Sequence, residues 1–495
     1  MDNVAALILA AGKGTRMRSG VCKVLHAVAG RPMISYVIDA VRACSPDRIA
    51  LVVGHQSEDV IKAVGGPAIE FAVQEPQLGT GHAVMAAGNL LREYPGDVLI
   101  LCGDIPLIRQ RTLSDFIGYH KLEASKLTVM TTRMENPYGY GRIVRDSSGF
   151  ISAIVEEKDA SDDHKRITEV NTGIYLAHGP LLFSLLERVG SDNAQEEYYL
   201  TDIVKEATKE SEPVRGFKLR DSHEAIGINS RSELARVSGV IWCELREQLM
   251  ESGVTLLDPG SVYIDSTVSI GQDTVIHPCV TLSGDTVIGR DCIIESGTYI
   301  INSKLGDGVR VLQGSRLDSA EVMNGTQVGP MAHLRPEAKI GQNARIGNFV
   351  EVKKSTIGDR TKASHLTYIG DASVGTDVNI GCGTITCNYD GKQKHRTVIN
   401  DRCFVGSDVQ FVAPVEIGQG SVIGAGSTIT RDVPPRSLAV ARTRQKVYAL
   451  REGQGPGPSS GKDRKDEDCL LTRRIGLPEP GAKQEPESSD EDRKP

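Results

Sequence analysis

Hydrophobic and polar positions follow two different patterns along this chain of 495 residues, and the change falls near residue 254. Before that point, short aliphatic runs alternate with longer amphipathic stretches. Such alternation predicts an α/β domain with a largely parallel, doubly wound sheet, whose ligands would bind at the carboxyl ends of the strands. The predicted strands are AALILAAG, IALVVGH, DVLILCGD, LTVMTTR and NTGIYLA, and the predicted helices are PMISYVIDAVRAC and TLSDFIGYHKLEA.

The stretch 230-252 predicts one long amphipathic helix, with Gly253 as its C-cap. Trp242, the only tryptophan of the chain, lies on this helix, where we expect it to pack rather than to take part in chemistry. A helix here would join an N-terminal domain, 1-229, to the part that follows. The apolar residues that recur at spacings of three and four are Leu234, Val237, Ile241, Leu245 and Leu249.

After residue 254, an aliphatic residue stands at nearly every sixth position, and a small or β-branched residue stands two positions before it. A period of six predicts a parallel β-helix, in which each hexad forms one face of a triangular coil and about eighteen residues make one turn. The predicted β-helix domain, with a C-terminal arm, spans 253-452. The aliphatic positions are Ile264, Ile270, Ile276, Leu282, Ile288, Ile294 and Ile300, then Val322, Val328, Leu334, Ile340, Ile346 and Val352, and finally Ile399, Val405, Phe411, Ile417, Ile423 and Ile429.

One polar run, GTITCNYDGKQKHRTVI at residues 383–399, interrupts this ladder. The register requires an aliphatic residue near Thr386 and near Lys392 and finds none. A solenoid tolerates an insertion on one face, and insertions collect on binding faces. We therefore expect a loop that projects from the coil toward a substrate and a neighbouring subunit.

Composition excludes several classes of protein. The net charge is -7, which gives no basic signal for nucleic acid or an anionic membrane. No stretch of 18 apolar residues suggests a membrane span, and no basic segment precedes the first apolar run, so we expect a buried strand there and a cytoplasmic protein. The stretch 453-495 is rich in Pro, Gly, Ser and charge, which predicts a disordered tail.

The ten cysteines are scattered, and none forms a C-x-x-C pair. We expect small buried hydrophobic residues in a reducing compartment rather than disulfides or a zinc site. Cys279 and Cys292, for example, fall at positions that the period assigns to the interior.

The turn after the first predicted strand, in LILAAGKGTRMRSGVCKVL, suggests a polyphosphate site. It fits neither the P-loop spacing nor the dinucleotide fingerprint. Gly12 and Gly14 would nevertheless let backbone N–H groups approach anionic oxygens, Arg16 could form a bidentate clamp and Lys23 could add a point charge. Taken alone, the turn is equally compatible with plain packing.

Further motifs sharpen this interpretation. LAAGKGTRM followed by KVL resembles the signature of nucleotide-sugar pyrophosphorylases, and QLGTGHA, CGDIPL, YGYGRIV, VEEKDA and EVNTGIY follow in the order of that family. Joined to a hexapeptide β-helix, the chain resembles, over about residues 4–448, the bacterial bifunctional enzymes with N-acetylglucosamine-1-phosphate uridyltransferase and glucosamine-1-phosphate N-acetyltransferase activity. The resemblance implies a Rossmann-like nucleotidyltransferase domain and a left-handed β-helix that forms a homotrimer with active sites between subunits.

The resemblance also implies the reactions. Acetyl-CoA would acetylate glucosamine-1-phosphate in the C-terminal domain. The N-terminal domain would then transfer uridylyl from UTP to N-acetylglucosamine-1-phosphate with Mg²⁺, which supplies UDP-N-acetylglucosamine for peptidoglycan and lipopolysaccharide precursors. No covalent nucleophile is required, because positioning and charge neutralisation suffice.

The residues that the resemblance assigns to uridyl transfer follow the motifs. Arg16 and Lys23 would be catalytic and hold the triphosphate, while Asp104 and Asn229 would bind Mg²⁺. The nucleotide would lie against Leu9, Ala10, Ala11, Gly12, Lys23, Gln74, Gly79 and Thr80, with Gly81 closing that loop, and the sugar phosphate against Gly141, Glu156, Asn171, Thr201 and Asn229.

Acetyl transfer requires a base, donors for an oxyanion and a groove for a thioester. His365 suits the base, because the ordinary pKa of histidine lies near neutrality; a buried histidine bonded to a backbone carbonyl is the alternative. Glu351 is expected to orient or tune it. By resemblance, the amino sugar would be held by Arg335, Lys353, Tyr368 and Asn379, with Lys394 beside the site. Acetyl-CoA would be held by Cys382, Asn388, Tyr389, Ser407, Ala425 and Arg442. Asn388 and Tyr389 would also complete the amino-sugar pocket.

Three cysteines depart from the family pattern. Cys22 stands where the family has Pro, and we expect its neighbour Lys23 to lower the pKa of the thiol and make it reactive. Cys102 stands where a larger hydrophobic residue is usual, and Cys382 where Ala is usual. Two other functions stay open: a pyrophosphorylase for another sugar with an assembly β-helix, and a non-enzymatic scaffold. The polar segments HLTY and NYDG argue against an assembly module, and the intact Arg16, Lys23, Asp104 and His365 argue against a scaffold.

Overall fold

The structure is a computed structural model that describes residues 3–66 and 68–449. The chain divides after Arg442 into two units, and the description below concerns the first, Met1–Arg442. The predicted tail 453-495 lies outside the described residues. No helix in the described part of the chain is long and apolar enough to cross a membrane.

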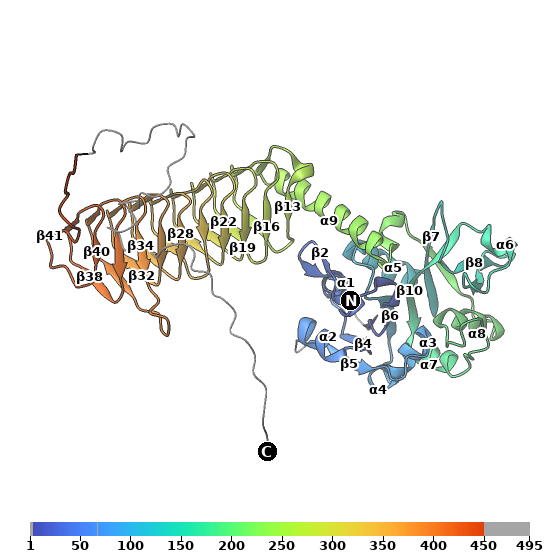
Figure 1. Cartoon of the computed structure of the whole chain (residues 1–495). Helices are drawn as coiled ribbons and strands as arrows, with labels where there is room; N and C mark the ends of the chain where they lie inside the picture. The colour runs from blue at the N-terminus through green and yellow to red at the C-terminus, as the bar shows by residue number, and fades with distance from the viewer. Residues whose placement is uncertain (1–2, 67, 450–495) are drawn as a thin grey trace, which may run out of the picture. The chain divides into compact units, whose positions relative to one another are not determined.

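The N-terminal half is built on one twisted sheet (Figure 1), in the order β11-β7-β10-β6-β1-β4-β5, with β8 paired to β10 and β9 paired to β8. β1 pairs in parallel with both β4 and β6, as predicted. The strands are β1 (Val4–Leu9), β4 (Arg48–Val53), β5 (Glu70–Val73), β6 (Asp97–Cys102), β7 (Leu127–Arg133), β8 (Arg142–Arg145), β9 (Ile151–Val155), β10 (Glu169–His178) and β11 (Arg215–Lys218); β2 (Ala27–Val28) and β3 (Arg31–Pro32) form a separate hairpin.

Two hydrophobic cores cover the two faces of this sheet. Alternate residues of β1 point to opposite faces, since side chains alternate along a strand. Val4 and Ile8 pack with α1, α5 and the start of α9, whereas Leu7 packs with α3, α7 and α8. The helices are α1 (Met33–Arg42), α2 (Ser57–Val64), α3 (Thr80–Ala86), α4 (Gly88–Leu91), α5 (Gln110–Leu122), α6 (Asp162–Lys165), α7 (Gly179–Leu186), α8 (Ile203–Lys209) and α9 (Arg231–Glu251), with short 3-10 turns at η1 (Thr15–Met17), η2 (Lys23–Leu25), η3 (Leu200–Asp202), η4 (Ser222–Ala225) and η5 (Pro259–Ser261).

The α/β class is confirmed, and the path β11-β7-β10-β6-β1-β4-β5 is largely parallel, with β10 as its antiparallel strand. β10 runs antiparallel to both of its neighbours, β6 and β7. The chain reaches β10 through the β8–β9 hairpin and the single turn α6, instead of the long crossover helix that a parallel connection needs.

Helix α9 joins the two halves and agrees with its predicted span within one residue at each end. Val237 and Ile241 pack into the core of the N-terminal half, whereas Leu249 packs against the interior of the β-helix. The ring of Trp242 meets that of Tyr263 edge-on at 5.1 Å, which fits the packing role expected for it.

The C-terminal half is a left-handed parallel β-helix whose three faces are three parallel sheets (Figure 1). Face 1 contains β12 (Thr255–Leu256), β15 (Val275–Ile276), β18 (Ile293–Ile294), β21 (Arg310–Val311), β24 (Gln327–Val328), β27 (Arg345–Asn348), β30 (Lys362–His365), β33 (Asn379–Ile380), β36 (Phe404–Val405), β39 (Val422–Ile423) and β41 (Leu438–Ala439). Face 2 contains β13 (Tyr263–Ile264), β16 (Thr281–Ser283), β19 (Tyr299–Ile301), β22 (Arg316–Asp318), β25 (His333–Leu334), β28 (Glu351–Lys353), β31 (Tyr368–Gly370), β34 (Ile385–Cys387), β37 (Gln410–Val412) and β40 (Thr428–Ile429). Face 3 contains β14 (Ser269–Ile270), β17 (Val287–Ile288), β20 (Lys304–Leu305), β23 (Glu321–Val322), β26 (Lys339–Ile340), β29 (Thr356–Ile357), β32 (Ala372–Val374), β35 (Thr397–Ile399) and β38 (Val415–Ile417).

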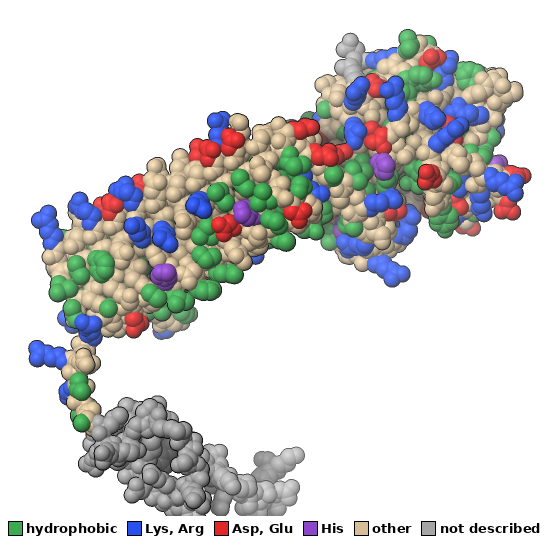
Figure 2. Space-filling view, turned by 90° about the horizontal axis from the view of Figure 1, so that it is seen from above, with side chains coloured by type: hydrophobic (Ala, Val, Ile, Leu, Met, Phe, Trp, Pro, Cys, Tyr) green, Lys and Arg blue, Asp and Glu red, His purple; other side chains and the backbone are tan. Residues whose placement is uncertain are grey.

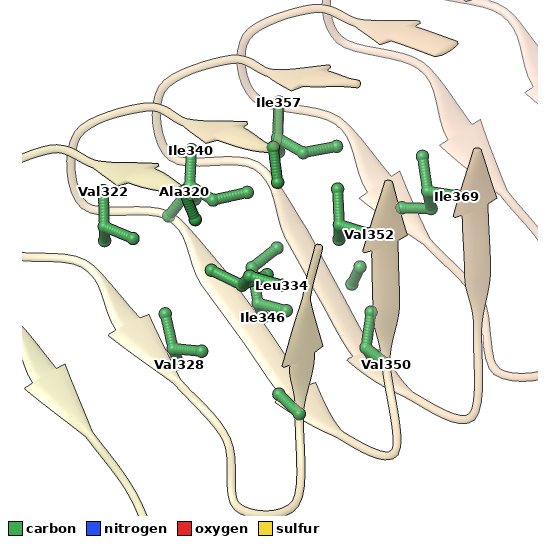
Figure 3. Close-up of a cluster of buried hydrophobic side chains, with 14 of the residues drawn as sticks. Ala320, Val322, Val328, Leu334, Ile340, Ile346, Val350, Val352, Ile357 and Ile369 are labelled. Carbon is green, nitrogen blue, oxygen red and sulfur yellow. The ribbon is translucent and has the colours of Figure 1, made fainter. Parts of the chain in front are cut away.

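The interior of the β-helix is filled by the predicted aliphatic ladder, part of which Figure 3 shows. All of the predicted positions are buried in one cluster except Ile270, which is partly buried at its margin. The ladder also continues where the period of six fails. Leu305 follows Ile300 after five residues and pairs directly with Ile288 of the coil before, so one residue is absent from a corner while the interior stays filled.

The polar interruption begins later than predicted. Thr386 is buried and takes the interior position itself, because it pairs with Phe411 of the next coil and its hydroxyl accepts a hydrogen bond from the Gly370 N–H at 2.8 Å. The insertion is the hairpin 388–396. Val374 pairs with Ile399 across it, so the coil resumes in register after the hairpin.

Left-handed backbone recurs at the corners of the coil, often at residues other than glycine. Cys279 is one of them, with a φ of 60°, and its side chain points outward, so the prediction that it is buried was wrong. Cys292 is buried, as expected, and all nine cysteines of the described residues are free thiols.

Candidate functional sites

Four of the predicted residues of the N-terminal half meet at one point. Lys23 Nζ donates to Asp104 Oδ2 in an ion pair and to Asn229 Oδ1 at 3.0 Å, and Arg16 Nη2 donates to the same amide oxygen at 2.9 Å. Two cations therefore share one amide oxygen, and one of them also contacts a carboxylate. Such an arrangement can bind phosphate oxygens through its cations and a metal ion through its two oxygens.

The fold brings these residues together from three segments. Asp104 follows the carboxyl end of β6, at the strand edge where α/β sheets bind ligands. Asn229 precedes α9, and the N–H of Ile228 donates to the Asp104 carbonyl at 2.9 Å. Gly14 adopts left-handed backbone at the turn after β1, where a Cβ would lie 2.7 Å from the Cβ of Lys23. The turn therefore needs glycine at this position, because any side chain would clash with Lys23.

The predicted nucleotide residues line the same edge of the sheet. Leu9 ends β1, and the Ala10 N–H donates to the Val52 carbonyl, which leaves Ala11 and Gly12 to form the turn; a Cβ on Gly12 would meet nothing within 4 Å. Gly12 therefore faces open space where a ligand could approach the backbone closely.

Gln74, Gly79 and Thr80 form a second, tightly held part of that region. The buried Gln74 amide donates to the Gly79 carbonyl at 2.9 Å. Gly79 has a φ of 109°, and a Cβ there would lie 2.6 Å from the Tyr198 carbonyl, so the loop approaches its neighbour too closely for any side chain. The Thr80 hydroxyl accepts from the Leu200 N–H at 3.0 Å, and the Gly81 N–H donates to the Tyr198 carbonyl at 2.7 Å.

The four remaining sugar-phosphate candidates form one cluster. The Thr201 hydroxyl donates to Glu156 Oε1 at 3.2 Å, and a Cβ on Gly141 would lie 3.5 Å from both Glu156 carboxyl oxygens. The Asn171 N–H donates to the Gly141 carbonyl at 2.8 Å. Burial raises the pKa of Glu156, and the nearby carboxylates of Asp159 and Asp202 add to the shift. The carboxylate oxygens can accept hydrogen bonds from sugar hydroxyls.

An ion pair that sequence reasoning missed fixes the loop that precedes Gly141 in this cluster. Arg142 is 2% exposed, and its guanidinium contacts Glu157 at 2.8 Å and donates to the Tyr140 carbonyl. Glu157 also accepts from the Gly139 N–H at 3.1 Å. Although burial opposes ionisation, these hydrogen bonds lower the pKa of Glu157. A buried charge of this kind needs its partner, so the pair holds the YGYG loop in one conformation.

The expectation for Cys22 was wrong. Its thiol is 3% exposed, and desolvation raises its pKa despite the lowering effects of the Val24 backbone and the Lys23 charge. Cys102, which lies 3.6 Å from the Cβ position of Gly173, has a pKa raised to about 12 by burial and by the Asp104 carboxylate. Neither thiol is poised to react.

We therefore expect a bulky thiol reagent to leave Cys22 unlabelled in the folded protein and uridyl transfer unchanged. The exposed Cys243 and Cys279 serve as internal positive controls in the same peptide mass spectrum. Labelling of Cys22 that UTP suppresses would contradict the structural assignment and restore the reactive-thiol hypothesis.

In the β-helix, the candidates divide between two edges of Face 2. The first, the lysine edge, lies where the strands of Face 2 end, and consists of Arg335, Lys353, Asp371, Asn388 and Lys394. Arg335 Nη1 contacts Glu351 Oε1 at 2.7 Å, and Asn388 Nδ2 donates to Asp371 Oδ2 at 2.5 Å. Contact with the Lys394 side chain, reinforced by the nearby Arg335 charge, lowers the pKa of Lys353. So many adjacent cations favour a bound anion.

The second, the histidine edge, lies at the corner before the strands of Face 2. Successive coils place Asn348, His365, Cys382, Ser407 and Ala425 there. The coils are tied together by backbone hydrogen bonds such as Asp408 N–H to the Cys382 carbonyl at 2.7 Å and Gly426 N–H to the Ser407 carbonyl at 2.8 Å. Arg442 donates to the Ala425 carbonyl at 2.7 Å. One edge therefore carries the candidate base and the candidate acetyl-CoA contacts in a row.

His365 is exposed, which excludes the alternative of a buried histidine. Its Nδ1 lies 2.5 Å from Asn348 Oδ1, a contact that sequence reasoning missed. An amide oxygen accepts hydrogen bonds, so Nδ1 carries the proton and Nε2 is left free to act as a base. The predicted orienting residue, Glu351, bonds Arg335 instead. The sequence could have predicted this contact, because Asn348 and His365 are 17 positions apart, which is the length of one coil.

Glu351 and Tyr368 stand side by side in register on Face 2, between the two edges. Asn379 lies on Face 1, in register with Lys362. Asn388 and Tyr389 belong to the lysine edge and its hairpin rather than to the histidine edge, so within one chain the structure does not bring them to Cys382, Ser407 and Ala425. The hairpin is closed by the His395 N–H, which donates to the Asn388 carbonyl at 2.8 Å, and it projects from the coil below β32 in Figure 1.

Comparisons with known proteins cover both halves. The family model described as nucleotidyl transferase matches residues 5–244, and the model of the bacterial transferase hexapeptide (six repeats) matches residues 267–302 and 396–431. Bifunctional protein GlmU of Pelobacter propionicus is 52% identical over 446 residues, which is 90% of this chain and 97% of that protein.

Two further relatives with the same name match this chain over a similar length. Bifunctional protein GlmU of Geobacter sulfurreducens is 51% identical over 463 residues, with 90% of this chain and 97% of that protein covered. The protein of the same name from Shouchella clausii is 47% identical over 445 residues, with 90% and 98% covered. Since one alignment spans the nucleotidyl transferase half, α9 and the β-helix together, the chain belongs to the family of bifunctional GlmU proteins.

Proposed function

We propose that the chain makes UDP-N-acetylglucosamine in two steps at two separate sites. Acetyl-CoA acetylates glucosamine-1-phosphate on the β-helix, and the product then reacts with UTP in the N-terminal half. The observation that carries this proposal is that each half holds its own complete set of reactive groups. Lys23, Asp104 and Asn229 converge in the first half, and His365 faces solvent on the second.

For uridyl transfer, Arg16 and Lys23 would bind the triphosphate of UTP at the turn after β1. A phosphate oxygen of N-acetylglucosamine-1-phosphate attacks the α-phosphorus, the bond to the bridging oxygen breaks, and pyrophosphate leaves. The two cations hold the leaving group and offset its negative charge, which is the main work in phosphoryl-type transfer. Glu156, Asn171 and Thr201 orient the sugar so that its phosphate lies in line.

The residues present fit Mg²⁺. Asp104 and Asn229 direct one carboxylate and one amide oxygen to the same cationic group, the Lys23 ammonium, so both can reach one ion. No group of three acidic, His or Cys residues suited to a metal occurs within residues 3–66 and 68–449. Mg²⁺ commonly takes one or two protein oxygens and completes its shell with phosphate and water. When bound, it supplies charge neutralisation between the phosphates.

For acetyl transfer, the amino sugar would lie across Face 2. A three-residue strand spans about 10 Å, so the phosphate can reach the lysine edge while the amine lies at the histidine edge. His365 Nε2 takes a proton from the amine, the amine nitrogen attacks the thioester carbonyl, and the C–S bond breaks to release CoA. Asn348 keeps His365 in the tautomer that this step requires.

Acetyl-CoA would lie along the histidine edge. The backbone N–H groups of Cys382, Ser407 and Ala425 donate no hydrogen bond within the described part of the chain, and they recur at the spacing of the coil. Unpaired N–H groups are strong donors, so they can bind the amide carbonyls of an extended pantetheine arm and the developing oxyanion. Arg442, at the end of this row, can reach the phosphates of the cofactor.

We also propose that the chain forms a homotrimer through the histidine edge. Met331, Phe349 and Leu366 occupy the left-handed corner positions of three successive coils there, and they are 47%, 59% and 57% exposed. Left-handed backbone disfavours such side chains by about 1–2 kcal/mol each, so exposed apolar residues at these positions point to a surface that is covered by another copy. Figure 2 shows hydrophobic side chains gathered on the β-helix surface among charged ones and histidine.

Replacing Phe349 and Leu366 by asparagine will convert the trimer into monomers, as measured by sedimentation or light scattering. Asparagine tolerates left-handed backbone, so the coil itself should not be strained. Arg402→Asn, at a left-handed corner position of another edge, is the matched control and should remain trimeric. An unchanged mass for the double variant would show that this corner is not the subunit interface.

The two reactions are tested together by mass spectrometry. The full chain is incubated with glucosamine-1-phosphate, acetyl-CoA, UTP and Mg²⁺, with one component left out at a time. Omission of UTP should leave N-acetylglucosamine-1-phosphate, and the complete mixture should give UDP-N-acetylglucosamine. If neither product forms, the proposal fails; if only another sugar phosphate is converted, the chain is a pyrophosphorylase of different specificity.

The proposal assigns uridyl transfer to residues 1-229, acetyl transfer to 253-452, and the connection to 230-252. The separate hydrophobic cores on the two sides of α9 support this division. We also propose a cytoplasmic location, because all nine described cysteines are free, as is usual in a reducing compartment.

A further inference from the structure

The segment before α9 is held by hydrogen bonds to Asp104 and to the first turn of the helix. Ser230 caps the helix, since its hydroxyl oxygen accepts from the Glu233 N–H at 3.2 Å. Glu233 reaches back in return, and its Oε2 accepts from the Asn229 N–H at 2.7 Å and from the Ser230 hydroxyl at 3.1 Å. This reciprocal arrangement is a variant of the capping box, in which the glutamate reaches the N–H of the residue before the N-cap, and it fixes the entry of the chain into the helix.

The capping box acts on the residue that the proposed uridyl site uses. The N–H of Ile228 is bound to the Asp104 carbonyl and the N–H of Asn229 to Glu233, so the backbone on both sides of Asn229 is fixed. The side chain of Asn229 then has little freedom, and its Oδ1 receives hydrogen bonds from Arg16 and Lys23. Glu233 thus controls where this oxygen lies relative to Asp104.

Glu233 is not needed to hold α9 itself in place. The helix has 21 residues and is anchored by Val237 and Ile241 in the core of the N-terminal half. Losing one capping contact costs about 0.5–2 kcal/mol and frays mainly the first turn. The first turn is where Asn229 is attached, so the loss should appear at the metal and phosphate site before it appears in the fold.

We propose that Glu233 is a positioning residue for uridyl transfer: its carboxylate fixes the backbone of Asn229, and thereby the oxygen that Asn229 offers to the metal ion. This inference rests on the proposed function of the N-terminal half. It assigns Glu233 no contact with substrate. It also requires only a hydrogen-bond acceptor at this position, so that the amide oxygen of glutamine can replace the carboxylate.

The test uses the full chain and four variants: Glu233→Ala, Glu233→Gln, Asn229→Ala and, as a matched control at the exposed far end of the same helix, Glu251→Ala. Binding of Mn²⁺ in the presence of UTP is measured by electron paramagnetic resonance, independently of turnover. We expect roughly tenfold weaker binding for Glu233→Ala and the same rise in the Mg²⁺ concentration needed for half-maximal rate. Glu233→Gln and Glu251→Ala should match the parent protein, and Asn229→Ala should set the maximum loss.

Three results would overturn the inference. The first is that Glu233→Ala binds Mn²⁺ as tightly as the parent protein. The second is that Glu233→Gln loses as much Mn²⁺ affinity as Glu233→Ala. The third is that Glu233→Ala also loses acetyl transfer, which would indicate a general structural defect. Failure of the parent protein itself to transfer uridylyl would instead refute the proposed function, so the two failures are distinguishable.

Discussion

Replacing His365 by alanine will lower acetyl transfer by about 10²–10⁴-fold, the usual loss when a general base is removed. Uridyl transfer in the same preparation will be unchanged. The amine of the substrate must lose a proton to form an amide, and His365 is the exposed histidine whose ring is held in one tautomer on the edge that carries the proposed acetyl-CoA contacts. The Lys353 and Arg335 cations still bind the phosphate, so the loss should fall on kcat rather than on KM for the amino sugar.

The control for this experiment is His277→Ala, which removes a histidine from the same kind of corner in an earlier coil. It should retain both activities. A loss of both activities in His365→Ala, with the mass of the assembly intact, would mean that the two reactions do not use separate sites. A bell-shaped pH profile of the parent protein that loses its acidic limb in His365→Ala would identify the histidine as the titrating group.

Replacing Asp104 by alanine will lower the other activity, uridyl transfer, and leave acetyl transfer unchanged. We expect uridyl transfer to fall about a thousandfold, because a metal ion contributes several kcal/mol of charge stabilisation and each 1.36 kcal/mol is a factor of ten in rate. The variant also leaves the ammonium of Lys23 without its carboxylate partner. Acetyl transfer should be unaffected, and a chelator added to the parent protein should reproduce the same division between the two activities.

Asp115→Ala, an exposed carboxylate on α5, is the control for charge removal. It should keep both rates. If Asp104→Ala retained its uridyl transfer and its dependence on Mg²⁺, the assignment of the carboxylate as a metal ligand would be wrong. If acetyl transfer fell as well, the variant would be perturbing the whole chain rather than one site.

Repetition explains why the β-helix could be predicted in such detail. Each aliphatic position such as Ile294 or Val352 repeats one simple requirement, an apolar side chain at the interior, and the requirement recurs every six residues. The prediction failed where the spacing changed or where a residue other than an aliphatic one fills the interior. Leu305 follows a corner that is one residue shorter, and Thr386 fills an interior position with a polar side chain whose hydroxyl finds a backbone partner. A count of aliphatic residues detects neither case.

In the N-terminal half, the candidate site could be predicted better than the fold. Motifs placed Arg16, Lys23, Asp104 and Asn229 in one site, and the structure brings them together. The direction of β10 could not be predicted, because nothing local in a strand specifies whether its neighbours run parallel to it. Such a choice depends on the connection, here a hairpin and a single turn rather than a crossover helix.

The supporting contacts were missed for a related reason. Asn348 and Glu233 touch no substrate in the proposed reactions, so a search for reactive side chains passes over them. Both had a signal in the sequence, however. Glu233 completes the S-x-x-E pattern of a capping box, and Asn348 stands one coil before the candidate base. Geometry, rather than residue type, makes them important.

If the hairpin 388–396 contacts the amino sugar, as the proposed function requires, the specificity of the enzyme is modular. Its two ends meet where the His395 N–H binds the Asn388 carbonyl, and the coil continues from Val374 to Ile399 as if nothing had been inserted. Hairpins of other lengths and sequences could therefore be exchanged at this point without rewinding the solenoid. In evolution or in design, such an exchange would alter the choice of acceptor sugar while the histidine edge, and the acyl chemistry with it, stayed the same.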